Sequence, residues 1–377
     1  MTATTSPETQ APITDTSKAA RFAFAREPKT SYGRLDRRTK RFVAGGLVTM
    51  FAFGLLFVYL LPLLFMATTS LKTEEQIANG QILPMSPDTA DIDGKQVVLL
   101  NVPLDDGSSR PLALVKPGRQ VSVFVDPDEP DVEIEWEGNW RGLQPTYQFD
   151  PGFSNFSKAW NSTTPKMGKM IWNTFVIAGI GMAGTVISST FVAYGLSRFR
   201  IPYKNLILAS LLATIILPRF VTLIPTFILW RYLGFIGTYV PLTLPHFFAN
   251  AYNVFLLRQF FLTIPKEMDE AAAIDGAGPF KTLVTVILPQ AKGAVLAVSL
   301  FHFFYAWNDF LEPLVFLVGK TNKFPLSVGL TQFLGIYDTN IPLVLAAAFI
   351  AMVIPLVVFV CLQRIFLRGI DLSGAVK

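Results

Sequence analysis

The sequence predicts an all-α membrane protein of six transmembrane helices, with a small β-rich domain inserted between the first and second helices. Three observations support this fold class: the apolar composition, the length of the uncharged segments, and a long polar insertion after the first of them. The 377 residues are 51% hydrophobic and 16% charged, whereas soluble proteins average about 25% charged residues. A chain of this composition is expected to be embedded in lipid.

The apolar segments have the length that a membrane requires. A helix needs about 20 consecutive apolar residues to cross the hydrocarbon core, and residues 43–66 and 171–196 satisfy this without any charge. Prolines or polar residues interrupt the other candidates, which are residues 206–229, 239–257, 294–317 and 343–362. Six spans are therefore expected, and Pro218 and Pro225 should bend or break the third.

One of these spans carries a packing signal. Small residues recur every four positions in the second span, at Gly181, Thr185, Ser189 and Ala193. They form a stripe along one side of a helix, where another helix can approach closely. We expect this stripe to serve helix packing rather than ligand binding.

The positive charges indicate the orientation in the membrane. They form three groups, one before the first span, one after the second and one after the sixth. The first group is Lys29, Arg34, Arg37, Arg38, Lys40 and Arg41, the second is Arg198, Arg200 and Lys204, and the third is Arg364 and Arg368. With six spans these groups share one side, which is the cytoplasmic side by the positive-inside rule. The sequence thus predicts a multi-pass protein of a bacterial plasma (inner) membrane, with both termini in the cytoplasm. The net charge of +5 then reflects contact with anionic lipid, and no nucleic-acid partner is expected.

The insertion between the first two spans is too long for a simple loop. Short apolar runs at residues 97–100, 112–115, 121–125 and 132–136 predict strands, bounded by turn residues such as Asp-Asp-Gly and Pro-Gly. The last run alternates apolar and acidic residues, and its acids fit a solvated sheet edge better than a cation site or a contact for a binding protein. The predicted domains are a basic N-terminal segment (1–42), the first helix (43–68), an extracytoplasmic insert (69–169) and a helical core (170–377).

A polar segment between the fourth and fifth spans carries the most informative motif. It contains Glu270-Ala271-Ala272, then three residues, Gly276, nine residues, and finally Val286-Ile287-Leu288-Pro289. Pro265 is suited to the first turn of a helix and Gly276 to the left-handed conformation that ends one. The segment is therefore expected to form two short helices around a glycine turn, with a second helix restarting at Pro279. Small side chains in the first helix let a partner approach its backbone.

This spacing resembles the coupling loop of permease subunits of ATP-binding-cassette (ABC) importers, whose pattern is EAA, three residues, G, nine residues, I, one residue, LP. The single departure is Val286 in place of isoleucine. The runs FYAWNDFLEPLVFL and LQRIFLRGIDLSGAVK also resemble the carbohydrate branch of this family, on its maltose-type, shorter-subunit side. The resemblance covers residues 43–68 and 155–377, and it implies a six-helix type I importer fold; the insert lies outside it.

The resemblance also implies partners and contact residues. The coupling loop (residues 263–290) would bind a dimer of ATP-binding subunits through Glu270, Ala271, Ala272, Gly276, Leu288 and Pro289. A second permease subunit would enclose the path, and an extracytoplasmic solute-binding protein would contact the loop after the fifth span through Gly335, Ile336, Tyr337 and Asp338. ATP and Mg²⁺ would be used by the partner ATPase, because Gly319-Lys320-Thr321 lacks the earlier glycine of a phosphate loop. The chain itself would then be no enzyme.

Polar residues inside the spans are candidates for a substrate path. Charges there are costly and usually face the bundle interior or a water-filled path. The candidates are Arg219, Asn250, Asn253, Tyr305, Trp307, Asn308 and Asp309. Amides, carboxylates and aromatic faces suit a sugar, but Arg219 could equally form a structural pair with Asp309, Glu312 or a carboxylate of the partner subunit.

Other functions stay open at this point. Within the importer class, glycerol phosphate or another polar solute is an alternative to oligosaccharide. A membrane sensor or scaffold is a different class of protein, and it would need a signalling domain. A channel or secondary transporter would leave the coupling motif unexplained. With one cysteine, Cys361, and two histidines, neither an intramolecular disulfide nor a metal site or cofactor is expected.

Overall fold

A computed structural model describes residues 37–92, 94–104, 107–334 and 340–374 of the chain. The chain divides into two compact units, Met1–Leu61 and Pro62–Lys377. The boundary lies inside helix α1 (Arg37–Ser70), whose part Phe42–Ser70 is long and apolar enough to cross a membrane. None of its most apolar stretch is buried within the described chain, so lipid or another apolar surface has to cover it.

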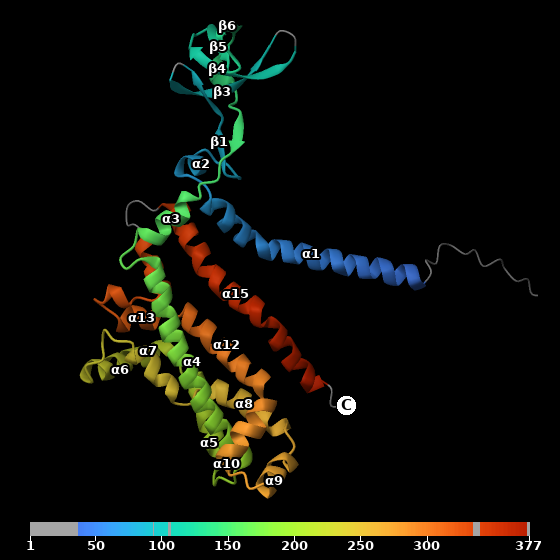
Figure 1. Cartoon of the computed structure of the whole chain (residues 1–377), viewed down its shortest axis with the longest axis vertical. Helices are drawn as coiled ribbons and strands as arrows, with labels where there is room; N and C mark the ends of the chain where they lie inside the picture. Colours follow the sequence, from blue (N-terminus) through green and yellow to red (C-terminus); the bar gives the residue numbers. More distant parts are fainter. Residues whose placement is uncertain (1–36, 93, 105–106, 335–339, 375–377) are drawn as a thin grey trace, which may run out of the picture. The chain divides into compact units, whose positions relative to one another are not determined.

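Helix α4 (Met167–Arg198) is the central helix of the second unit (Figure 1). It packs against α8 (Ala251–Thr263) and α12 (Lys292–Asn308). The expected small-residue stripe is buried in these contacts. At Gly181 the approach is so close that a β-carbon would lie 2.5 Å from Nε2 of His302, which only glycine avoids.

The third candidate span is broken at one of its two prolines. Helix α5 (Lys204–Ala213) ends in the short turn η2 (Thr214–Ile216), and α6 (Arg219–Tyr232) follows at an angle of 97°. Pro218 is extended and directly precedes α6, where a missing amide hydrogen costs nothing. Pro225 lies inside α6, which continues to Tyr232.

Residues 239–257 do not form the continuous helix that the sequence predicts. They contain α7 (Val240–Thr243), the 3₁₀ turn η3 (Leu244–Phe247) and the beginning of α8. Extended backbone at Phe248 and Asn250 separates the pieces. The break has a local cause, because the Asn250 side chain accepts a hydrogen bond from the Asn253 amide at 3.2 Å and thereby caps α8.

The candidate span at 294–317 is also interrupted. Helix α12 ends at Asn308, Asp309 is extended, and α13 (Leu311–Phe316) begins after it. Pro313 lies in the first turn of α13, where helices tolerate proline. The break places Asp309 at a helix end, so its side chain is not held inside a regular turn.

These breaks affect the number of spans. Three described helices are long and apolar enough to cross a membrane, namely Phe42–Ser70, Met167–Arg198 and Ile341–Gln363. The number rises to five if each of two bent pairs is one span: Lys204–Ile216 with Arg219–Tyr232, and Pro279–Gln290 with Lys292–Asn308, which meet at 83°. The predicted count of six is not reached among the described residues.

The remaining helical elements are α2 (Glu74–Ala78), η1 (Trp140–Gly142), α3 (Ser154–Asn161), α9 (Glu267–Ile274), α10 (Pro279–Thr282), η4 (Leu283–Ile287), α11 (Leu288–Gln290), η5 (Thr321–Lys323), α14 (Leu326–Gly329), η6 (Leu330–Phe333) and α15 (Ile341–Gly374).

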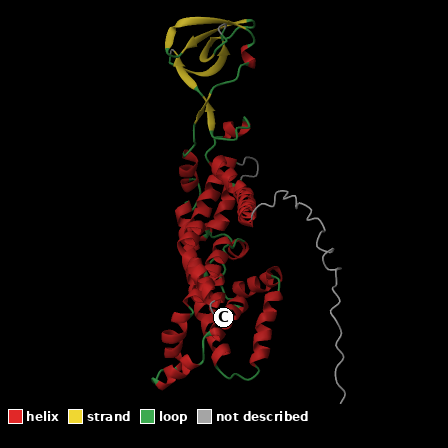
Figure 2. Cartoon of the chain, turned by 90° about the vertical axis from the view of Figure 1, so that its right-hand side faces the viewer, coloured by secondary structure: helices red, strands yellow, loops and turns green. Residues whose placement is uncertain are grey.

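The insert between α1 and α4 contains the strands of the described chain, drawn yellow in Figure 2. Five of them form an antiparallel sheet in sequence order: β2 (Thr89–Ile92), β3 (Lys95–Pro103), β4 (Ser109–Lys116), β5 (Val121–Asp126) and β6 (Glu129–Glu137). The four predicted strands correspond to β3–β6. A separate pair, β1 (Met85–Pro87) with β7 (Tyr147–Phe149), was not expected, since three residues are too few to show alternation.

Edge strand β6 follows its predicted alternation from Ile134 onward, whereas Val132 is exposed. Ile134 and Trp136 are half-buried against Phe124 and its neighbours, while Glu133, Glu135 and Glu137 are exposed. The acids thus lie on a solvated sheet edge, in agreement with the preferred interpretation of the sequence.

Side-chain hydrogen bonds join the two ends of the insert. The buried Asn155 amide, in α3, donates to the carbonyls of Ser70 at 2.9 Å and Lys72 at 2.8 Å. Nearby, the amide of Gln76 donates to Ser86 Oγ at 2.9 Å and to the Asp150 carbonyl at 3.2 Å. The chain therefore leaves and re-enters the helical part at one closed point.

Candidate functional site

The coupling loop folds as the expected helical hairpin. Helix α9 ends before Gly276, which has a left-handed φ of 75°, and α10 begins with Pro279 at its first position. The π-helical turn η4 and helix α11 follow, and the chain then bends into α12. Local residue choice thus explains both helix ends.

The residues expected to contact an ATPase differ in exposure. Glu270, Ala271, Gly276 and Pro289 are exposed, Leu288 is half-buried, and Ala272 is buried. Ala272 therefore faces the body of the protein. The four exposed positions remain available to a partner.

Large apolar side chains lie on the outer side of the loop. Ile274 is 86% exposed and Phe280 is 67% exposed, and Met268 and Val284 are exposed as well. Such side chains grouped on a polar segment are typical of a protein interaction surface.

The inner side of the loop is packed. Leu283 and Ile287 are buried with Leu257 and Phe261 of α8. Because the hairpin is seated on a core, it presents its outer side as a defined surface.

Helix α4 holds the hairpin from the side. Arg198 Nε lies 3.1 Å from Asp269 Oδ2, and the Tyr194 hydroxyl donates to the Pro279 carbonyl at 3.2 Å. The rings of Phe191 and Phe280 stack with centroids 6.3 Å apart. Both arms of the hairpin are therefore attached to the last turns of α4.

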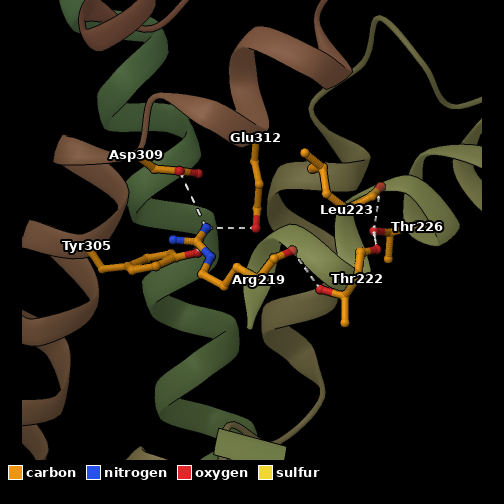
Figure 3. A network of polar contacts seen from close by, with 7 residues as sticks. All are labelled: Arg219, Thr222, Leu223, Thr226, Tyr305, Asp309 and Glu312. Atoms are coloured by element: carbon orange, nitrogen blue, oxygen red, sulfur yellow. Dashed lines mark hydrogen bonds and ion pairs between the residues drawn. The ribbon is translucent and has the colours of Figure 1, made fainter. Parts of the chain in front are cut away.

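A second polar site surrounds Arg219, the first residue of α6 (Figure 3). Its Nη2 atom donates to Glu312 Oε1 at 2.7 Å and lies 3.4 Å from Asp309 Oδ1. The same nitrogen donates to the Tyr305 hydroxyl, and the guanidinium lies over the Tyr305 ring, 4.8 Å from its centroid. We call these four residues the arginine cluster. It confirms that Arg219 pairs with both carboxylates considered from the sequence.

Arg219, Tyr305 and Asp309 of the arginine cluster line a cavity of about 400 Å³. Phe220, Asn308, Phe310 and Leu311 complete its lining. The Arg219 side chain remains 50% exposed, and one guanidinium faces two carboxylates, so the cluster is formally anionic when both acids are ionised. The lining combines aromatic faces, an amide and the Asp309 carboxylate, which are groups that contact sugars.

Two histidines extend this polar region into the bundle. The rings of His246 and His302 have centroids 4.4 Å apart, and both lie within 6 Å of the Tyr305 ring. Thr185 Oγ1 of α4 is hydrogen-bonded to His302 Nδ1 at 3.0 Å. A continuous set of hydrogen bonds and ring contacts thus joins α4, α12 and α6.

The other predicted path residues have different environments. Trp307 is buried and donates to the Ala351 carbonyl of α15 at 3.2 Å, so it packs two helices together. Asn250 is the helix cap described above, and Asn253 is buried, with no hydrogen-bond partner for its Oδ1 among the described residues. Asn308 lines the cavity beside the arginine cluster.

The predicted contact for a binding protein cannot be placed. Gly335, Ile336, Tyr337 and Asp338 lie outside the described residues.

Comparison with protein families decides what kind of protein carries these features. The model of binding-protein-dependent transport system inner membrane components matches residues 184–372. The chain belongs to this family. The matched region contains the coupling loop and the arginine cluster.

Curated relatives are permeases as well. The chain is 33% identical over 243 residues to the osmoprotective compounds uptake permease protein GgtD of Synechocystis sp., covering 64% of this chain and 80% of that protein. It is 37% identical over 214 residues to the sn-glycerol-3-phosphate transport system permease protein UgpE of Pectobacterium atrosepticum, covering 56% and 75%. Among solved structures, a bacterial ABC transporter involved in the import of the acidic polysaccharide alginate matches with a TM-score of 0.56 and 20% identity, covering 88% of this permease and 99% of that chain. This likeness shows a shared fold.

Sequence reasoning missed the contacts that seat the coupling loop of the permease. The sequence identifies Arg198 only as one of the positive charges at a membrane boundary, and it gives Asp269 no partner. One signal was present, since Phe191, Tyr194 and Arg198 recur at helical spacing on one face of α4. Their partners lie far along the chain, so pairing could not be inferred from spacing alone.

Proposed function

We propose that this chain is a six-span permease subunit of an ATP-driven importer of carbohydrate, and that it forms the translocation path with a second permease. The coupling loop supports the proposal: it combines the Glu270-Ala271-Ala272 pattern with exposed apolar side chains on a seated hairpin. A dimer of ATP-binding subunits docks there. ATP and Mg²⁺ bind to those subunits, so the permease needs neither cofactor nor metal.

The coupling of ATP hydrolysis to transport follows from the different affinities of the ATPase dimer for the two states of the bundle. A ligand shifts a conformational equilibrium only by the difference in its affinity for the two states. Closure of the ATPase dimer on ATP moves the coupling loop and favours the outward-facing bundle. Hydrolysis then returns the bundle to the inward-facing state.

The arginine cluster supports a neutral, hydroxyl-rich solute. Asp309 and Asn308 line its cavity and can form hydrogen bonds with hydroxyls, and Tyr305 and Phe220 offer ring faces. Arg219 already contacts both carboxylates, so its charge is compensated and attracts an anion weakly. Glycerol phosphate remains the second candidate, because the similarity to UgpE is as high as that to GgtD.

The topology belongs to the same proposal. The segment 1–42 and the coupling loop are cytoplasmic, helix 43–68 and the core 170–377 cross the inner membrane, and the insert 69–169 is extracytoplasmic. A solute-binding protein docks on the extracytoplasmic side and contacts residues 335–338. Lipid covers the apolar surface of α1.

Co-purification tests this proposal. The tagged chain is isolated from its native membrane, associated proteins are identified by mass spectrometry, and ATPase activity is measured with neutral sugars and with glycerol 3-phosphate. A second permease and an ATPase stimulated by a neutral sugar are expected. Stimulation by glycerol 3-phosphate alone would favour the second candidate, and recovery of the chain without any ATPase would contradict the importer function in favour of a sensor or channel.

A further inference from the structure

Besides its chain connection to α8 and the core contact of its inner side with that helix, the coupling loop has two further attachments to the helical bundle. One is covalent, through the π-helical turn η4 and the 83° bend into α12. The other is made by side chains of α4. Hinges form at a few residues where one element ends and the next begins, and the bend between α11 and α12 is such a place.

The attachment to α4 uses one face of that helix. Phe191, Tyr194 and Arg198 are spaced three and four residues apart, and they reach Phe280, the Pro279 carbonyl and Asp269 respectively. Arg198 Nη2 also donates to the Ile264 carbonyl at the end of α8, at 3.0 Å. Arg198 thus ties α4, α8 and α9 together.

The ion pair is largely shielded from solvent, and its two charges lie close together without a hydrogen bond between them. The Arg198 side chain is 7% exposed and that of Asp269 is 23% exposed. Both carboxylate oxygens of Asp269 are shielded from solvent, and neither has a hydrogen-bond donor among the described residues. The charge of Asp269 is therefore compensated mainly by Arg198. Removal of one partner leaves a shielded charge unpaired, which is far more costly than losing a surface pair.

We propose that Arg198 and Asp269 are positioning residues that fix the coupling loop to α4 and make α4 the lever of the permease. This inference rests on the proposed coupling function. When the ATPase dimer moves the loop, the ion pair prevents the hairpin from turning at its bend, and the movement enters α4. The far part of α4 contacts His302 through Thr185 and Gly181, and His302 adjoins the arginine cluster.

The test uses the complete transporter, purified through this chain with its second permease and ATP-binding subunit and reconstituted in lipid nanodiscs. A reporter cysteine replaces Phe220 beside the cluster, in a Cys361→Ser background. Two quantities are measured: the amount of retained ATP-binding subunit, and the change in maleimide labelling when ATP, Mg²⁺ and vanadate are added. Neither readout requires the transported solute.

The neutralised variants Arg198→Gln and Asp269→Asn should keep at least half of the ATP-binding subunit. Their ATP-dependent labelling change should fall about threefold or more. Exchange of the charges, Arg198→Asp with Asp269→Arg, should restore at least half of the response. The matched control is the exposed pair Lys116–Glu133 of the insert, 2.8 Å apart, whose neutralisation should change nothing.

A wild-type response in either neutralised variant would overturn the positioning role. If neither variant reaches the membrane, the double variant Arg198→Gln with Asp269→Asn leaves no shielded charge unpaired, and a wild-type response in that variant would overturn the role as well. A wild-type chain that retains no ATP-binding subunit refutes the proposed function itself, whereas a wild type and variants that respond equally refute only the lever.

Discussion

Two regions of this permease are built around an arginine. One arginine is held in a single geometry, whereas the other can change its partners. At the coupling loop, Arg198 is 7% exposed and contacts one carboxylate. In the arginine cluster, Arg219 is 50% exposed and contacts two carboxylates beside a cavity. Among the described residues, Arg198 has no second carboxylate to exchange with, so this shielded pair holds its geometry. An open arginine between two acids can change partners when a solute or a helix moves.

The largest effect on assembly with the ATP-binding subunits is expected from the turn of the coupling loop. Gly276→Pro demands a negative φ where the backbone has a φ of 75°, so the hairpin cannot close as it does now. Retention of the ATP-binding subunit during purification should fall at least tenfold, by roughly 1.4 kcal/mol or more in binding free energy. Gly278→Ala is the control, because a β-carbon there meets nothing within 4 Å. Normal solute uptake by Gly276→Pro would contradict the coupling role.

The two arginines should differ in stability. Arg198→Gln leaves Asp269 shielded and unpaired, and breaking a buried pair costs about 3–5 kcal/mol. Arg219→Gln should cost less than half as much, because water reaches that side chain. Thermal unfolding midpoints of both variants in the same detergent measure this difference. Equal losses would mean that exposure does not separate the two regions.

The contact that links the regions can be tested at Gly181. A β-carbon there would overlap His302 Nε2, and overpacking of a tight core costs about 1–3 kcal/mol. Gly181→Ala should lower the unfolding midpoint, while Gly179→Ala on the same helix, with no atom within 4 Å of the added carbon, should not. An unchanged midpoint in Gly181→Ala would show that α4 and α12 separate easily.

The smallest effect concerns solute charge. Glu312→Gln removes one of the two acids and makes the arginine cluster formally neutral. Glycerol 3-phosphate should then compete with uptake of a neutral sugar about threefold to tenfold better, equivalent to roughly 0.7–1.4 kcal/mol. Glu133→Gln in the insert is the control. Unchanged competition would remove the charge argument for a neutral solute.

Local signals in the sequence predicted local structure. Gly276 and Pro279 determine their own backbone conformations, so both arms of the hairpin could be placed, and the alternation along residues 132–136 predicted β6. Pro218 marked the break before α6. At 239–257 the apolar composition predicted one helix, but the Asn250 cap and two prolines divide the segment.

Long-range partners were harder to infer. The arginine cluster was anticipated because an isolated charge in a span requires a partner, and few acids lie in the other spans. Arg198 gives no comparable signal in the sequence, because a basic residue at a membrane boundary needs no partner. Only the folded chain brings it to Asp269.

The hydrogen bonds that join the two ends of the insert have a consequence for how such a protein can change in evolution. Because Asn155 binds the carbonyls of Ser70 and Lys72, the two ends of the insert meet as closely as the ends of a short loop. Everything between them is a module whose size and shape are independent of the helices that carry it. A lineage could lengthen, replace or lose this domain in one step while the transport machinery stayed intact.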